Sequence, residues 1–517
     1  MSKVFKSVVI IMIAMIFSKI LGFSRDLFLA YFYGTSSFTD AYVFSFMLPS
    51  VLFGSLGMAL LTTIIPIYKK NLKEKGIVKS NLFLNNVLNI AVIISILISI
   101  ISYLYPEIIV NMMSGEIDHR IYQTTVEFCK IILLAVPFIM IQYVFMAYLQ
   151  LNDNFKIPAL VGIPFNIVLI ASIVLGSIYK SKEILIYGSL FSFVAIVIFL
   201  YVNVKSYGYK INFKLDFKDK DTKKVFKNLV FVFIGLSVLQ ITTISDRALA
   251  FGLSNGSVSA LNYSNRLNEF IFGIFALSII TVMYPKMSEL CVKKDYKALE
   301  HIIRKSINII SILIVPIVFF IIFFSNNIIS FLFERGSFDI NATIITANAF
   351  RFYAFSILGF SFIDLFSKVF YSMDERKTPL FVGIFAICIN LIFNYLLKDK
   401  FEISGIAIST SIASILGALI LFMLIKLKTK IKGGKKLVIN LVKIFIASFL
   451  MSYIAYFISL QLESIIFIGN NLINKALNLC ISGIIGVFIY IGLIVILKVD
   501  EIKEVLELIL SKLKINK

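Results

Sequence analysis

The side chains in this sequence that could do chemistry are charged groups set within long apolar stretches. Lys19, Arg25 and Asp26 lie in the first stretch, Asp40 opens the second, and Arg266 lies in the middle of the chain. A charge at the centre of a bilayer costs roughly 2.5–3.5 kcal/mol even on lenient insertion scales, so it should face water or a partner. Guanidinium groups bind phosphate oxygens well. Lys19, Arg25 and Arg266 therefore predict a cationic cavity for an anionic ligand.

Local ion pairing is the alternative explanation for these cations. Arg25 adjoins Asp26, and Arg266 precedes Glu269 by three residues, a spacing that places both side chains on one helix face. Snorkelling or buried pairing is the expectation for three other intramembrane cations, Lys130, Arg351 and Lys368.

The elements that carry these charges are predicted to be membrane-spanning helices. The 517 residues are 59% hydrophobic and 15% charged, which leaves too much apolar surface for a soluble domain. About 20 apolar residues cross the hydrocarbon as a helix. Fourteen spans are predicted, at about 7–33, 40–67, 82–105, 123–150, 158–178, 183–204, 226–254, 258–284, 306–327, 343–372, 379–397, 403–425, 438–460 and 474–497. The fold class is an all-α polytopic membrane protein.

The net charge of +21 is concentrated in alternate short loops, in runs such as Lys69-Lys70 and Lys223-Lys224. That distribution is typical of membrane orientation and of contact with anionic lipids, and it argues against nucleic-acid binding. It places both termini in the cytoplasm. The apolar N-terminal stretch lacks a small-residue cleavage site, so we expect it to be retained as the first helix.

The sequence also contains an internal repeat. When the chain is shifted against itself by about 220 residues, Gly54 aligns with Gly273 and Pro66 with Pro285, and two short polar turns align before Pro158 and Pro379. The alternative is that amphipathic helices ending in proline simply look alike. A repeat of six helices predicts two parallel lobes around the cavity. The predicted domains are residues 1–220, residues 221–430, and an appended helix pair with a tail at 431–517.

Several motifs resemble those of one transporter family. The stretch FSKILGFSRDLFLAYFYGTSSFTDAYVFSFMLP carries Gly22, Arg25, Asp26, Asp40 and Pro49 in the family's order. Later matches are NYSNRLNEF around Arg266, LFERGSFD at 332–339 and FYSMDERKTP at 370–379. Over essentially its whole length the chain resembles the MurJ lipid II flippases of the multidrug/oligosaccharidyl-lipid/polysaccharide exporter superfamily.

The resemblance implies that the chain flips lipid II, the undecaprenyl-pyrophosphate-linked precursor of peptidoglycan, in the bacterial inner membrane during cell wall biogenesis. It implies a monomeric transporter without an organic cofactor, whose cavity residues include Lys19, Arg25 with Asp26, Asp40 and Arg266. Lys19 replaces the family's usual arginine. After Pro49 the chain reads SVLFGSLGMALL, so one expected cavity cation and one carboxylate are missing.

Sodium binding in the second lobe is a further implication of the resemblance. The matching residues are Asp246, Asn390, Asn394 and Thr410, with the backbone carbonyl of Ile406. Asn394 stands where the family has a carboxylate. Because a hard cation prefers oxygen ligands that carry negative charge, a site with one acid is expected to be weak.

Rival functions remain open at this stage. One is a flippase for another lipid-linked oligosaccharide, of the O-antigen or capsule type, which the altered segment after Pro49 allows. A drug/cation antiporter would use intramembrane carboxylates without a cationic cluster, and a scaffold would need no charged cavity. An enzyme is not expected, because the sequence has neither a G-x-x-x-x-G-K-[ST] phosphate loop nor an acidic pair in an outer loop.

Overall fold

The computed structural model describes residues 3–113, 119–213, 215–429, 434–465 and 471–499, and these contain helices and turns but no strand. The first half consists of α1 (Lys3–Tyr33), α2 (Ser37–Leu48), the π-helix η1 (Pro49–Phe53), α3 (Gly54–Leu104), α4 (Pro106–Met113), α5 (His119–Ile132), the 3-10 turn η2 (Leu133–Ala135), α6 (Val136–Leu151), α7 (Lys156–Ala159), α8 (Gly162–Ile178), α9 (Lys182–Ser206) and α10 (Lys220–Phe251). The second half consists of α11 (Ser257–Ile271), the π-helix η3 (Phe272–Ala276), α12 (Leu277–Val292), α13 (Tyr296–Phe333), α14 (Ile340–Ser372), α15 (Lys377–Thr429), α16 (Gly434–Ile465) and α17 (Asn471–Ile496).

The fourteen predicted spans are present. Within the described residues, ten helical segments are long and apolar enough to cross a membrane. Two of these segments are each a pair of helices that meet at a non-helical residue, Gly76 in α3 and Glu402 in α15. The helices α1 and α10, with 31 and 32 residues, complete the set. The all-α polytopic prediction is therefore confirmed, and the short helix α4 is an addition that the sequence did not predict.

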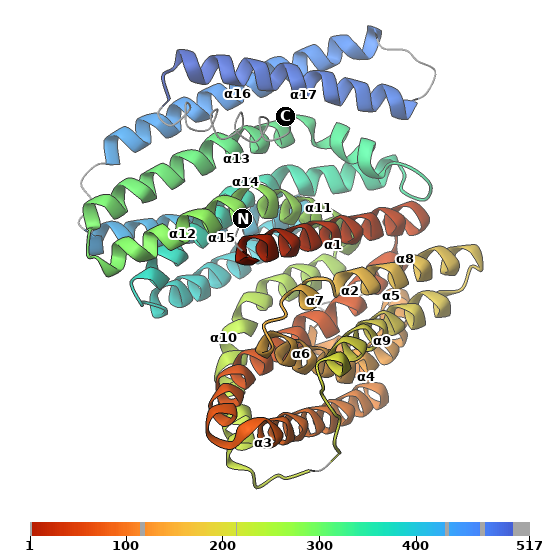
Figure 1. Ribbon diagram of the computed structural model, residues 1–517. Helices are drawn as coiled ribbons and strands as arrows, with labels where there is room; N and C mark the ends of the chain where they lie inside the picture. Colours follow the sequence, from red (N-terminus) through yellow and green to blue (C-terminus); the bar gives the residue numbers. More distant parts are fainter. Residues whose placement is uncertain (1–2, 114–118, 214, 430–433, 466–470, 500–517) are drawn as a thin grey trace. The chain divides into compact units, whose positions relative to one another are not determined.

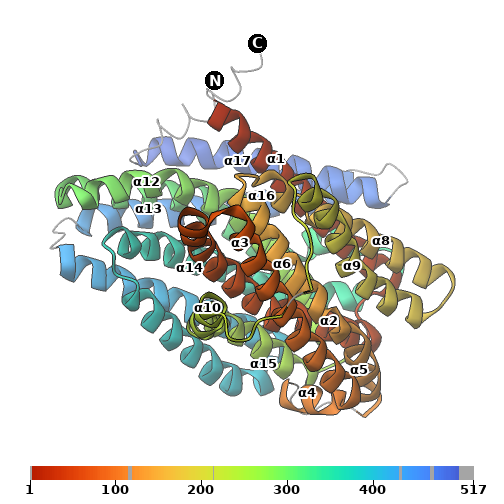
Figure 2. The same cartoon turned by 60° about the horizontal axis from the view of Figure 1, so that its bottom comes forward.

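The chain folds into two compact units. Unit 1 comprises residues 1–259 and 335–339, and unit 2 comprises residues 260–334 and 340–517. Unit 1 includes α10, which packs along α3 (Figure 2). The domain limits at 220 and 430 follow helix order and remain a prediction.

Unit 1 is held together by several helix pairs. α3 packs against α6, α8 against α9 and α1, and α2 against α5. Aromatic side chains fill the space between them. Tyr42 of α2 lies edge-on to Phe128 of α5 and donates or accepts a hydrogen bond with Ser189 of α9 at 2.9 Å. These contacts fix α2, which carries Asp40, against the rest of the unit.

Unit 2 is built around α13, α14 and α15, and the appended helices α16 and α17 pack together and against α13 (Figure 1). Polar contacts attach α17 at both ends. Lys475 donates to Ser330 at 2.6 Å and forms an ion pair with Glu334 at 3.0 Å. Near the other end, the Tyr490 hydroxyl donates to the Ile312 carbonyl at 2.8 Å.

The turns between helices support the internal repeat. Non-helical residues with left-handed backbone recur at matching places, in the pairs Gly34 and Gly256, Gly76 and Lys294, Asp153 and Asp374, and Lys180 and Glu402. The numbers within each pair differ by 218 to 222, close to the shift found in the sequence. Asp153 and Asp374 also end their helices with the same pair of backbone hydrogen bonds, the Schellman pattern.

The two π-helices occupy matching places in the repeat. The second span of each half is interrupted near its middle, by η1 in the first half and by η3 in the second. A π-helical turn inserts an extra residue into the helix and locally weakens its hydrogen-bond ladder. Each of these spans also contains the proline that the repeat aligned, Pro66 and Pro285. The duplicated helices thus share both their turns and their interruptions.

Candidate functional site

Arg25 is a largely buried cation in the second half of α1. Its Nε and Nη2 atoms donate to Oδ1 of Asp26 at 3.0 and 2.7 Å, and only 12% of the arginine side chain is exposed. The guanidinium also lies 5.9 Å from the ring of Phe46 on α2. These contacts orient the guanidinium and use two of its five N–H groups, so three remain for a ligand.

Lys19 lies six residues earlier on α1 and is exposed. Six helical residues span about 9 Å and rotate the side chain by roughly 120°. Lys19 therefore lies about two turns from Arg25, on a neighbouring face of α1.

Arg266 belongs to unit 2. Its Nη1 atom forms an ion pair with Glu269 at 2.8 Å, as the spacing of the two residues in the sequence predicts. Glu269 also accepts a hydrogen bond from Asn265 at 2.9 Å. The side chains of Arg266 and Glu269 are 40% and 53% exposed, so this cation is much more accessible than Arg25.

Three further intramembrane cations have local contacts, as expected of structural charges. The ammonium of Lys130 lies 4.5 Å from the ring of Tyr103. Lys368 lies over Tyr284 at 5.5 Å, and Arg351 donates to Ser325 at 3.1 Å.

Asp40 is buried, and its carboxylate accepts three hydrogen bonds at the start of α11. The amides of Gly256 and Ser259 and the hydroxyl of Ser259 each donate to it at 2.7 Å. All of these residues belong to unit 1. A carboxylate in this position caps the free N–H groups of α11 and interacts favourably with the helix dipole. In this conformation Asp40 is occupied by the protein, and its direct contact with substrate remains a prediction.

Three loops of unit 1 pack around this cap, and we call residues 31–40, 254–259 and 335–339 the three-loop cluster. Ser337 donates from its amide to the Tyr31 carbonyl at 2.8 Å and from its hydroxyl to the Phe32 carbonyl at 2.9 Å. Each loop has one glycine with positive φ. A Cβ on Gly34 would lie 2.2 Å from the Ser337 carbonyl oxygen, and one on Gly336 would lie 2.3 Å from that of Tyr31. The glycines of the motifs GTSSFTD and RGSFD are thus required, because the backbones of the two loops lie too close together for a side chain.

A row of buried asparagines near the start of the third span has no counterpart in the sequence predictions. These residues, Asn85, Asn86 and Asn89 of α3, bind the backbone of the described residues 209–213 and 215–217, which we call the strap. Asn86 accepts from the Asp216 amide at 2.8 Å and donates to the Asp216 carbonyl at 2.7 Å. Asn85 and Asn89 donate to the carbonyls of Lys210 and Asn212 at 2.9 and 2.7 Å.

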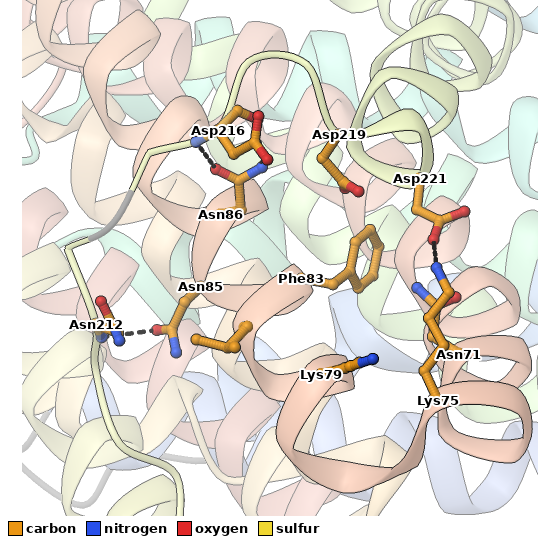
Figure 3. Close-up of a pocket in the computed structure, with 11 residues that line it drawn as sticks. Asn71, Lys75, Lys79, Phe83, Asn85, Asn86, Asn212, Asp216, Asp219 and Asp221 are labelled. Atoms are coloured by element: carbon orange, nitrogen blue, oxygen red, sulfur yellow. Dashed lines mark hydrogen bonds and ion pairs between the residues drawn. The ribbon is translucent and has the colours of Figure 1, made fainter.

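The strap precedes α10 and holds it on α3 (Figure 3). Asp219 caps α10 by accepting from the Thr222 amide at 2.8 Å, and Lys75 forms an ion pair with Asp221. The Lys75 ammonium lowers the pKa of Asp221, and the carboxylate raises the pKa of Lys75. The pair is therefore fully charged at neutral pH and weakens when acid protonates Asp221.

The residues that the resemblance assigns to sodium do not come together in one unit. Asp246 belongs to unit 1, and Asn390, Asn394 and Thr410 belong to unit 2. The three in unit 2 are buried and bind one another. Asn394 donates to Asn390, and Asn390 to Thr410, each at 3.1 Å.

In this conformation two oxygens of this trio take part in a neutral hydrogen-bond network. The Asn390 amide oxygen accepts from Asn394, and the Thr410 hydroxyl accepts from Asn390 and donates to the Ile406 carbonyl at 3.1 Å. The Asn394 amide oxygen is buried and lies outside this network. A sodium ion would need these oxygens and a negative charge. Among the described residues, moreover, no cluster of three or more histidine, cysteine or acidic side chains could hold a metal. The sodium site remains a prediction, and no transport step is derived from it.

The fold and its intramembrane cations define a polytopic helical transporter. A solved multidrug-resistance MATE transporter of the MOP superfamily, in an inward-facing conformation, has the same fold. It has a TM-score of 0.63 with 14% identity over 80% of this chain and 94% of its own. The family profile "Lipid II flippase MurJ" matches residues 29–476. The chain belongs to this family, which is a family of transporters rather than enzymes, as the sequence predicts.

Individual relatives agree with this assignment. A protein from Thermosipho africanus named "Lipid II flippase MurJ" is 27% identical over 447 residues, which cover 85% of this chain and 89% of that protein. "Probable lipid II flippase MurJ" from Buchnera aphidicola subsp. Baizongia pistaciae is 27% identical over 429 residues, covering 81% and 83%. The solved structure "Lipid II flippase MurJ, inward closed conformation" has a TM-score of 0.78 with 26% identity, and covers 94% of this chain and 98% of its own.

Replacement of Asp40 by Asn is expected to destabilise the protein. The amide presents N–H groups where the carboxylate accepts from Gly256 or Ser259, and a buried donor left without an acceptor costs about 1–3 kcal/mol. We expect a lower midpoint of thermal unfolding, measured by circular dichroism at 222 nm. The matched control is Asp153→Asn, the same change at an exposed turn. Equal midpoints for the two variants would contradict the capping role.

Substitution of Gly34 by alanine is expected to disrupt the three-loop cluster. The new Cβ would meet the Ser337 carbonyl at 2.2 Å, on a backbone with φ of 59°. Two controls separate these causes. Gly76→Ala has positive φ with no atom within 4 Å, and Gly383→Ala is helical and open. The yield of monodisperse protein should fall most for Gly34→Ala, less for Gly76→Ala, and not at all for Gly383→Ala. A different order would show that contact with Ser337 is unimportant.

Loss of the Asn86 side chain is expected to release the strap. Asn86→Ala removes both bonds to the Asp216 backbone, and the loss of roughly 1.4 kcal/mol corresponds to about tenfold faster amide exchange. Hydrogen–deuterium exchange at the Asp216 amide, which donates to Asn86, measures this effect. The control is Asn203→Ala, because within the described residues Asn203 bonds only to the Phe199 carbonyl of its own helix, at 2.8 Å. Unchanged exchange in Asn86→Ala would mean that the strap is held by other contacts.

Proposed function

We propose that this chain flips lipid II from the inner to the outer leaflet of the bacterial cytoplasmic membrane by alternating access. The observation that carries the proposal is the buried, pre-oriented Arg25 with three N–H groups left for a ligand, in a chain of the lipid II flippase family. The cargo is a diphosphate-linked lipid, so its charge requires cations inside the membrane. This transport step belongs to peptidoglycan biosynthesis.

Arg25, Lys19 and Arg266 are the proposed contacts of the diphosphate. Arg25 offers a planar fork that matches two phosphate oxygens, which a lysine cannot reproduce. Asp26 holds this fork in place and lowers the cost of a buried cation while no substrate is bound. Arg266 and Glu269 form a more exposed pair. The lipid tail stays in the bilayer, where its transfer costs little.

The proposed orientation has both termini in the cytoplasm, because lysine and arginine concentrate in the loops on that side. An inside-negative potential then favours the outward movement of an anion by roughly 2.3 kcal/mol per charge per 100 mV. The emptied cationic site is drawn back by the same field. No hydrolytic step is needed, and the chain is proposed to act as a monomer surrounded by anionic lipids.

A flippase for another undecaprenyl-pyrophosphate-linked oligosaccharide is the second candidate. The segment after Pro49, which runs through η1 into the start of α3, lacks the charges that the resemblance to the family leads us to expect there. A different sugar would still present the same diphosphate to Arg25. A test with a defined cargo is therefore required.

The test is complementation of a bacterium depleted of its own lipid II flippase. We expect the wild-type chain to restore growth, and Arg25→Ala and Arg266→Ala to fail because each removes a proposed phosphate contact. Arg25→Lys should fail too if the planar fork matters. Fluorescent lipid II flipping in proteoliposomes should decrease in parallel, by at least tenfold for Arg25→Ala, equivalent to about 1.4 kcal/mol.

The matched control is Arg376→Ala, which removes an exposed arginine in the turn before α15. It should complement fully, and all variants should be present in the membrane at equal levels. Rescue by both Arg25→Ala and Arg266→Ala would refute the cavity assignment. Failure of the wild-type chain, with flipping of a different undecaprenyl-linked oligosaccharide, would favour the second candidate.

A further inference from the structure

A pocket of about 260 Å³ lies in unit 1 beside the strap, between α3 and the start of α10 (Figure 3). Its volume is just below the roughly 300–1,000 Å³ of pockets for whole drug-sized ligands, so it suits a small polar group. The lining combines lysines, asparagines and acids with two apolar side chains, Leu82 and Phe83.

The acids of this pocket are already engaged. Asp219 caps α10, Asp216 accepts from the Lys218 amide at 2.8 Å, and Asp221 pairs with Lys75. Lys79 differs from them. It extends into the pocket from α3 (Figure 3), and among the described residues no ion pair or hydrogen bond involves its ammonium. Lys79 is therefore the lining cation without a carboxylate partner in the part of the chain that the structure describes, while Asp216 and Asp219 keep their negative charge.

The surroundings add to this positive charge. Residues 69–79 and 216–227 contain ten lysines and four acids, and the ion pair of Lys75 with Asp221 brings the two segments together. A phosphate entering the pocket would thus move into a region of net positive charge. The carboxylates on the pocket wall reduce this attraction. Removing one of them should therefore strengthen phosphate binding, and the test below includes such a variant.

The apolar part of the lining points to a lipid rather than a soluble phosphate. Leu82 is 43% exposed and begins the third predicted span, one turn after Lys79. In the proposed orientation this level is the inner surface of the membrane, where lysines attract anionic headgroups. The exposed Leu82 can contact an acyl chain, and Lys79 beside it can contact the phosphate of the same lipid.

We propose that this pocket binds the phosphate of an anionic phospholipid headgroup from the inner leaflet, with Lys79 as its principal contact. Lys75 lies beside it, so a bound phosphate competes with Asp221 for this second ammonium. Binding would thus act on the ion pair that joins α3 to α10. The proposal rests on the orientation given above, but not on lipid II as cargo.

The experiment measures lipid binding to the purified full chain by native mass spectrometry, in a detergent that leaves lipid sites accessible. The probes are dioleoyl phosphatidylglycerol, dioleoyl phosphatidylcholine and glycerol 3-phosphate. We expect the wild type to prefer phosphatidylglycerol, and Lys79→Gln to bind it about fivefold more weakly, the effect of one lysine near a membrane surface. Asp216→Asn should bind it more tightly, because a carboxylate on the wall is removed.

The matched control is Lys73→Gln, which removes the same charge from an exposed lysine on α3 that does not line the pocket. Its affinity should stay within twofold of the wild type. Equal losses in the two lysine variants would show diffuse attraction and overturn the pocket. Equal binding of the two lipids by the wild type would also overturn it.

Glycerol 3-phosphate distinguishes the source of the phosphate. If it binds as tightly as the lipid and depends on Lys79, the pocket is a site for soluble phosphate esters, and the lipid assignment is wrong. No lipid II is present in this measurement. A negative result therefore leaves the flipping activity untouched, and failed complementation leaves the lipid site untouched.

Discussion

The cap that Asp40 places on α11 is the interaction on which the arrangement of unit 1 depends. Its three hydrogen bonds join the start of α2 to a helix that begins more than 200 residues later. A buried carboxylate is tolerated here because it meets only donors and the positive end of a helix dipole. Around this cap, the loops bearing Gly34 and Gly336 approach so closely that no Cβ fits. The cap and the glycines depend on each other, because neither contact exists unless the loops meet.

Duplication explains why the same turn conformations and helix interruptions recur along the chain. Gly34 and Gly256, Asp153 and Asp374 take left-handed conformations at matching turns, and the second span of each half carries a π-helix. In a bilayer the backbone of each span must satisfy its own hydrogen bonds, so a duplicated helix retains its ends and interruptions while its side chains diverge. One charge is retained as well. Arg247 follows Arg25 by 222 residues, and both side chains are largely buried.

The sequence predicts what depends on local patterns and misses what depends on tertiary contacts. The fourteen spans follow from bilayer thickness, and the pairs of Arg25 with Asp26 and Arg266 with Glu269 follow from helical spacing. Asp40 is different, because its donors lie more than 200 residues away. The asparagines of α3 were missed as well, although three amides within NNVLN at the start of an apolar run were a detectable signal. Their partners are backbone groups of the strap, and no residue type there identifies them.

The ion pairs that Arg25 and Arg266 form with acids bear on any account of transport. An unpaired arginine within the membrane would be costly to insert, and the partners Asp26 and Glu269 reduce that cost. The same acids also compete with an anionic substrate. A diphosphate carries more charge than one carboxylate and can use the three donors that Asp26 leaves on Arg25. In the proposed mechanism it gains these contacts without breaking the ion pair of Arg25 with Asp26. Release from this site then breaks only the phosphate contacts.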